Sequence, residues 1–110
     1  MDVHQRTHGD VGVLACSGRL NMVTAPSLKA AIATAATGPL PRLVIDMSEV
    51  TFVDSSGLGV LVGGLKLVRQ SGGDLRIVVR SSQVLNVLAL TNLDRILHPY
   101  GTVAEASSGW

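Results

Sequence analysis

The stretch from Val50 to Val62 constrains this chain most. It places an apolar entry, one carboxylate, two hydroxyls and two glycines directly before a further apolar run. A Ser or Asp just before an apolar periodic segment is the usual start of a helix, because its side-chain oxygen accepts hydrogen bonds from the free N–H groups of the first turn. We therefore expect Ser55 and Ser56 to lie at the N-terminus of a helix.

A helix N-terminus suits a serine that is modified. Its unpaired N–H donors and partial positive charge would hold a phosphate with about 0.3–1 kcal/mol of dipole attraction. Gly57 and Gly59 leave the first turn without side chains, so the backbone of another protein could approach the hydroxyl closely. The same residues also fit a purely structural role, in which Ser55 is an N-cap and the two glycines form a tight turn.

Length and charge narrow the function classes. The 110 residues fit one domain over residues 1–110. The net charge is +1, with nine basic and eight acidic residues that are scattered along the chain. Direct binding to nucleic acid or to an anionic membrane usually needs a basic patch, so neither partner is expected. The single cysteine, Cys16, lies in an apolar stretch and is expected to be a small buried side chain, although a reactive thiol stays open.

The chain shows no sign of export or membrane insertion. Its first residues are not a basic segment followed by an apolar core, and no run approaches the roughly 18 apolar residues that a membrane span requires. We expect a cytoplasmic monomer without a cofactor or a metal.

The N-terminal part predicts a hairpin followed by a helix. Residues 2–8 suit an edge strand, Val11–Ser17 a second strand, and Gly18–Asn21 a break after it. Thr24 is a candidate helix cap with a proline in the first turn. A buried stripe follows at helical spacing, formed by Leu28, Ala31, Ile32 and Ala35, and the helix is expected to stop at Thr37-Gly38-Pro39.

The central part predicts a covered strand and a long helix. Leu43–Met47 is nearly all apolar, as in a central strand, and Ser48–Val53 reads as a linker. The helix should begin at Ser56. Its apolar stripe is Leu58, Leu61, Val62, Leu65 and Val68. Gly63 and Gly64 inside the helix cost roughly 1 kcal/mol each relative to Ala, so both are expected to pack closely against the sheet.

The C-terminal part predicts a strand, a helix and a last short strand. Residues 75–79 suit a strand after a turn, and Ser81 or Ser82 can cap a helix that runs to Leu90. Val84, Leu85 and Leu88 would form its buried side. Asn92 is a candidate left-handed terminator, and Arg95–His98 a last short strand.

Alternating strands and helices after the first hairpin predict an α/β fold with a mixed sheet. Loops that end strands and begin helices gather at one end of such a sheet. Residues 18–24 should therefore lie near residues 54–59.

The sequence motifs fit neither a dinucleotide-binding enzyme nor a serine hydrolase. The glycines from Gly57 to Gly63 read GxGxxxG rather than the GxGxxG of dinucleotide-binding folds, and they follow the clear strand by about ten residues. A serine hydrolase would need a base near Ser55 or Ser56, whereas the three histidines lie in terminal segments, at His4, His8 and His98. We expect surface histidines and no enzymatic activity.

The run from Leu43 to Val62 resembles the anti-sigma factor antagonists of the STAS domain family. The resemblance rests on Val-Ile-Asp-Met-Ser leading into Phe-Val-Asp-Ser-Ser-Gly-Leu-Gly, on Gly18-x-Leu20 with Thr24-Ala25 upstream, and on Gly72-Gly73 before an apolar strand. It covers the chain from Val11 to about His98. It implies a STAS-like mixed sheet of about four or five strands with helices mainly on one face.

The resemblance also implies a function. The unphosphorylated protein would bind an anti-sigma factor and free a sigma factor for RNA polymerase. The anti-sigma factor would double as a serine kinase that phosphorylates Ser55, and a PP2C-type phosphatase would reverse this step. The implied partner-binding surface comprises Asp54, Ser55, Ser56, Gly57, Leu58, Gly59, Arg19, Asn21 and Thr24.

Two departures from the family pattern concern this surface and the C-terminus. Members often carry an acidic residue after the strand-two glycine and an Asp two places later, where this chain has Arg19 and Asn21. The usual C-terminal helix is shortened to residues 102–110, which could leave an apolar patch at the end of the sheet. Two alternatives stay open, a STAS scaffold in a larger sensory or transporter-linked assembly and a small nucleotide-binding or hydrolytic protein.

Overall fold

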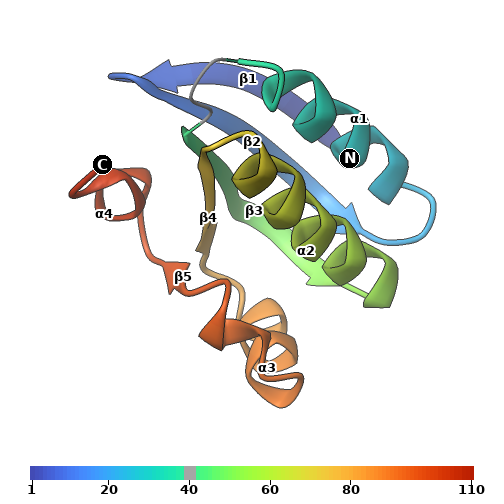
Figure 1. Cartoon of the computed structure of the whole chain (residues 1–110). Coiled ribbons are helices and arrows are strands. Elements are labelled where there is room, and N and C mark those ends of the chain that lie inside the picture. The colour runs from blue at the N-terminus through green and yellow to red at the C-terminus, as the bar shows by residue number, and fades with distance from the viewer. Residues whose placement is uncertain (39–41) are drawn as a thin grey trace.

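The fold is a five-stranded mixed sheet. The computed structural model describes residues 1–38 and 42–110 (Figure 1). The strands lie in the order β1-β2-β3-β4-β5, with β1 antiparallel to β2 and every other neighbouring pair parallel. They are β1 (Asp2–His8), β2 (Val11–Leu20), β3 (Arg42–Val53), β4 (Asp74–Val79) and β5 (Pro99–Tyr100).

Three of the α-helices share one core with the sheet. The helices are α1 (Ala25–Ala35), α2 (Ser55–Gln70), α3 (Ser82–Leu90) and α4 (Val103–Ser107), with a 3₁₀ turn η1 at Leu93–Arg95. Buried side chains of α1, α2 and α3 pack on the same sheet face as Leu14, Ile45 and Ile77. Figure 1 shows α1 and α2 side by side across this face. The predicted fold class, with helices mainly on one face, is therefore confirmed.

The N-terminal hairpin forms as predicted, but its second strand is longer. β1 is an exposed edge strand paired only with β2 within the described residues. The predicted break at residues 18–21 is wrong, because β2 continues to Leu20 and pairs there with the end of β3. Gly18 has φ +97° at a register shift. A β-bulge thus absorbs the glycine that the sequence suggested as a terminator.

The predicted linker at residues 48–53 is also wrong. These residues continue β3, and Glu49, Val50, Phe52 and Val53 pair with residues 17–20 of β2. Val50 and Val53 are buried whereas Glu49 and Thr51 are exposed. β4 pairs only with the first half of β3. The second half is less buried and has mixed polarity, so the sequence shows no continuous apolar run there that would indicate a strand.

Helix α1 buries the predicted stripe, with Leu28 and Ile32 in the core and Ala31 and Ala35 packed against it. Thr24 is the N-cap residue, but its side chain makes no capping hydrogen bond, so that part of the prediction is wrong. The helix ends at Ala35, two residues before the predicted stop at Thr37-Gly38-Pro39, of which Pro39 lies outside the described residues.

The two mid-helix glycines of α2 differ. A Cβ on Gly64 would lie 3.0 Å from Cδ1 of Ile32 and 3.4 Å from Cδ1 of Leu75, so this glycine permits close packing against α1 and β4. A Cβ on Gly63 would meet nothing within 4 Å. The packing explanation is therefore confirmed for Gly64 and wrong for Gly63.

The segment after β4 partly follows prediction. Val84 and Leu88 of α3 are buried, but Leu85 is 38% exposed. Asn92 adopts the predicted left-handed conformation with φ 59°. The predicted strand at residues 95–98 is wrong, because Leu93–Arg95 form the 3₁₀ turn and the last strand comes at Pro99–Tyr100.

The C-terminal tail covers the second face of the sheet. Ala106 of α4 is buried against Val11, Val13, Val44 and Val78, with Val103 and Trp110 packed beside it. The apolar patch expected from the short tail is thus filled at this position. Among residues 1–38 and 42–110, no helix has the length and apolar character needed to cross a membrane.

Candidate functional site

Asp54 joins the start of α2 to the loop between β2 and α1. It is the N-cap of α2, and its Oδ1 accepts a hydrogen bond from the Gly57 N–H at 3.0 Å. Its Oδ2 accepts from the Met22 N–H at 3.2 Å, and its own N–H donates to the Leu20 carbonyl at 3.2 Å. The predicted meeting of residues 18–24 with residues 54–59 is confirmed. Figure 1 shows both segments at the same end of the sheet.

Ser55 is the first residue of α2 and is exposed, while Ser56 is half-buried. Because the Asp54 carboxylate caps the helix, the alternative in which Ser55 serves as the N-cap is wrong. The Ser55 side chain is therefore not needed to start the helix. Its hydroxyl is open to a reaction partner at a helix N-terminus.

The loop after β2 is held by its own polar side chains. Oδ1 of Asn21 accepts from the N–H groups of Val23 and Thr24 at 3.0 and 3.1 Å. Oγ1 of Thr24 donates to the Arg19 carbonyl at 2.6 Å and accepts from the Asn21 N–H at 2.9 Å. The Arg19 guanidinium lies over the Phe52 ring, 4.1 Å from its centroid. Arg19, Asn21 and Thr24 thus lie near Asp54 but are engaged within the chain.

The first turn of α2 has a buried side and an open side. A Cβ on Gly57 would lie 2.7 Å from side-chain atoms of Leu20 and Val53, so this glycine lets the helix approach the strand ends. Leu58 is 8% exposed and belongs to the core. Gly59 is exposed, with nothing within 4 Å of a Cβ placed there. Of the predicted surface on this turn, Ser55 and Gly59 face outward.

Gln83 of α3 also positions this site, a role that the sequence pattern did not predict. Its Oε1 accepts from the Val53 N–H at 3.0 Å, and its Nε2 donates to the Val53 carbonyl at 3.3 Å. β4 ends at Val79, so the Gln83 amide satisfies backbone groups that no strand pairs on that side. The one signal was a glutamine at the second residue of a predicted helix.

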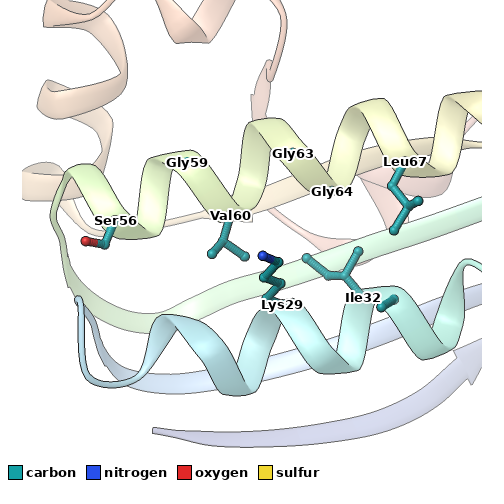
Figure 2. A pocket seen from close by; sticks show the side chains of 9 residues that line it. Lys29, Ile32, Ser56, Gly59, Val60, Gly63, Gly64 and Leu67 are labelled. Carbon is teal, nitrogen blue, oxygen red and sulfur yellow. The ribbon is translucent and has the colours of Figure 1, made fainter.

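A groove of about 430 Å³ runs between α1 and α2 and begins at Ser56. Figure 2 shows Ser56 at one end, Leu67 towards the other, and the Lys29 side chain reaching from α1 into the space beside Val60. Ile32 and Ala33 of α1 and Gly59, Gly63 and Gly64 of α2 complete its walls. The open side of α2 therefore lines a largely apolar groove that extends from Ser56 towards Leu67.

The other side chains with reactive groups are a buried cysteine and three exposed histidines. Burial, with a smaller contribution from the Asp46 carboxylate, raises the pKa of the Cys16 thiol from 9.0 to about 12. Cys16 is 3% exposed, as expected of a small buried side chain. The three histidines are exposed, as predicted. Outside residues 39–41, no cluster of three or more His, Cys, Asp or Glu side chains is arranged to hold a metal ion.

The glycines that suggested a dinucleotide fingerprint lie inside α2 itself. Gly57, Gly59 and Gly63 all fall within Ser55–Gln70, whereas a phosphate-binding fingerprint forms the turn between a strand and a helix. This geometry gives the three glycines no phosphate-cradling role.

Comparisons with known proteins agree with this fold. The anti-sigma-F factor antagonist RsfB of Mycobacterium tuberculosis is 31% identical over 102 residues, covering 93% of this chain and 83% of that protein. A Thermotoga maritima relative is 43% identical over 65 residues, which are 59% of this chain and 58% of that protein. The matched part thus spans less than two thirds of that relative.

Solved structures agree as well. The crystal structure of an anti-sigma factor antagonist from Mycobacterium paratuberculosis has a TM-score of 0.86 and 33% identity, covering 96% of this chain and 89% of that one. The family model described as the STAS domain matches residues 2–106. The chain therefore belongs to the STAS domain family.

Proposed function

We propose that this chain is an anti-sigma factor antagonist that is switched at Ser55. The unphosphorylated form binds an anti-sigma factor that is also a serine kinase, and this binding releases a sigma factor. Transfer of phosphate to Ser55 ends the binding, and a PP2C-type phosphatase restores it. On this proposal the protein acts in the cytoplasm as a monomer and works by binding rather than by catalysis. The names of its relatives in two mycobacterial species support the antagonist role.

The observation that carries the proposal is the exposed hydroxyl of Ser55 at the first residue of α2. Asp54 supplies the cap, so modification of Ser55 removes no hydrogen bond that starts the helix. Gly59 adds an open surface one turn further along α2, where a kinase backbone can approach. Accessibility and structural independence are the two properties that a reversible modification site needs.

Phosphate would change binding more than folding. It adds about −1.5 to −2 charges and three acceptor oxygens beside the Asp54 carboxylate. Attraction to the helix N-terminus, worth about 0.3–1 kcal/mol at an exposed site such as Ser55, offsets part of the repulsion from Asp54. Burying the new charge against a partner has no such compensation, and a loss of ~4 kcal/mol weakens binding about a thousandfold. Release without unfolding is the expected result.

Intact-mass spectrometry after incubation with ATP and each purified anti-sigma factor of the same organism tests the proposal. The protein should gain one phosphate, and Ser55→Ala should gain none. Ser56→Ala is the matched control, because it removes the neighbouring half-buried hydroxyl and should still be modified. A complex that forms while no such kinase modifies the protein would contradict the switch and favour the scaffold alternative.

A further inference from the structure

Two apolar side chains project from the loop that Asp54 holds. Met22 is 73% exposed and Val23 is 81% exposed, on the segment between β2 and α1. Most exposed apolar residues occur singly, whereas these two are adjacent and lie at the same end of the sheet as Ser55. Two adjacent, highly exposed apolar side chains therefore indicate a contact surface rather than ordinary surface composition.

The polar side chains of this loop are used inside the chain. The Asn21 amide oxygen accepts from two backbone N–H groups, and Thr24 Oγ1 links the Arg19 carbonyl to the Asn21 N–H. The Arg19 guanidinium stacks on Phe52. The polar groups build the loop, and the two apolar side chains are what the loop presents to its surroundings.

The same hydrogen bonds make the loop rigid. The N–H groups of Met22 and Val23 are both paired, to Asp54 Oδ2 and Asn21 Oδ1 respectively. A preorganised loop loses less conformational entropy on binding than a flexible one, so its side chains contribute more to affinity. Methionine is enriched at protein interfaces, and an exposed apolar side chain gains affinity when a partner removes it from water.

We infer that Met22 and Val23 are an apolar anchor that inserts into a nonpolar pocket of the anti-sigma factor. The inference rests on the proposed function and names the chemistry of the partner surface opposite the β2–α1 loop. Asp54 contacts the anchor through the Met22 N–H and the helix that carries Ser55 through the Gly57 N–H, so one docking event places both Ser55 and the anchor against the partner.

The test uses the anti-sigma factor kinase that transfers phosphate to Ser55, with ADP in place of ATP so that no phosphate moves. Titration calorimetry of the whole chain should give a Kd that rises about tenfold for Met22→Ser and for Val23→Ser, equivalent to about 1.4 kcal/mol each. Val23→Ile keeps an apolar side chain at this position, so its Kd should lie closer to that of the unaltered chain than the Kd of Val23→Ser does. Leu90→Ser is the matched control, because Leu90 is 84% exposed but lies at the end of α3.

A kinetic measurement separates anchoring from reaction. With ATP present, Val23→Ser should raise the KM of the kinase for this chain about tenfold and leave kcat unchanged, because Ser55 itself is untouched. The affinity ratio between the unaltered chain and Val23→Ser should stay the same in 50 mM and 500 mM NaCl, since an apolar contact is not screened.

The outcomes distinguish the two proposals. Equal affinity of the serine variants and the unaltered chain overturns the anchor and leaves the Ser55 switch intact. A similar loss in Leu90→Ser, or a ratio that shrinks at high salt, also overturns the anchor. If no anti-sigma factor binds the unaltered chain, the proposed function fails and the anchor fails with it.

Discussion

The carboxylate of Asp54 accepts a hydrogen bond from the backbone N–H of Met22, 32 residues earlier in the chain, at 3.2 Å. The other carboxylate oxygen caps α2 through Gly57. One side chain therefore fixes both the start of the helix that carries Ser55 and the loop that carries Met22. Loss of this carboxylate should be felt at both places.

Asp54→Ala should lower the free energy of unfolding by about 1–2 kcal/mol, because it removes the helix cap and the hydrogen bond from the Met22 N–H. Asp54→Asn should lower the free energy of unfolding by less, because the amide oxygen can still accept from the Gly57 N–H. A smaller loss remains, because the NH₂ group cannot accept from the Met22 N–H. Urea denaturation followed by circular dichroism measures both. Glu49→Ala, which alters an exposed carboxylate, should stay within about 0.5 kcal/mol. Equal stability of Asp54→Ala and Glu49→Ala would mean that the two hydrogen bonds contribute nothing.

The glycines of α2 should respond to alanine in opposite directions. Gly57→Ala places a Cβ 2.9 Å from the Leu20 carbonyl oxygen and should destabilise the fold by about 1–3 kcal/mol. Gly59→Ala meets open space within a helix and should stabilise it by about 0.5–1 kcal/mol. Thermal unfolding of the two variants gives the signs directly.

Gly63→Ala separates stability from partner binding. Like Gly59, Gly63 has nothing within 4 Å of an added Cβ, so both variants should be more stable than the unaltered chain. Of these two glycines, only Gly59 belongs to the predicted partner-binding surface. Of the two variants, only Gly59→Ala should therefore weaken the complex. Equal binding by both variants would remove Gly59 from that surface.

Cys16 should make the fold sensitive to alkaline pH. Its pKa is raised from 9.0 to about 12, so between these values the unfolded chain loses a proton that the folded chain keeps. The free energy of unfolding should therefore fall by up to about 1.4 kcal/mol per pH unit in this window, with no contribution below pH 9. Denaturation series at pH 8 to 11 should show this extra slope relative to Cys16→Ala. Parallel curves for the two proteins would rule it out.

The C-terminal segment depends on Arg76. Its Nη1 donates to the carbonyls of Ala106 and Ser108 at 2.9 and 3.2 Å, and its guanidinium lies 4.1 Å from the centroid of the Trp110 ring. Arg76→Ala should cost about 1–3 kcal/mol and shift the emission of the single tryptophan to longer wavelength. Arg80→Ala, at an exposed arginine just after β4, should change neither. An unshifted emission in Arg76→Ala would show that α4 holds Trp110 without this contact.

Local chemistry was enough to predict the order of elements from β1 to α3 and the position of Ser55 at the start of a helix. Apolar periodicity located α1, α2 and β4, and the preference of Asn for left-handed backbone located the turn at Asn92. The carboxylate and hydroxyls before an apolar run located the start of α2. Each of these signals depends only on residues close together in the chain, so it can be interpreted without knowing the fold.

Several of the errors share a cause, because contacts between residues far apart in the chain decided the structure there. Residues 48–53 became a strand because residues 17–20 of β2 pair with them, and Gly18 entered a bulge rather than ending β2. Gly63 and Gly64 were predicted to pack alike, yet only Gly64 has Ile32 and Leu75 against it. Gln83 gained its role from the early end of β4.

The sequence by itself determined the alternation of strands and helices and the placement of Ser55 at a helix start, because caps and periodicity act over a few residues. Only the tertiary structure decided that Asp54 rather than Ser55 caps the helix, and that its second oxygen holds the loop of Met22 and Val23. That choice depends on the end of β2 lying beside the end of β3, a relationship between residues far apart in the chain.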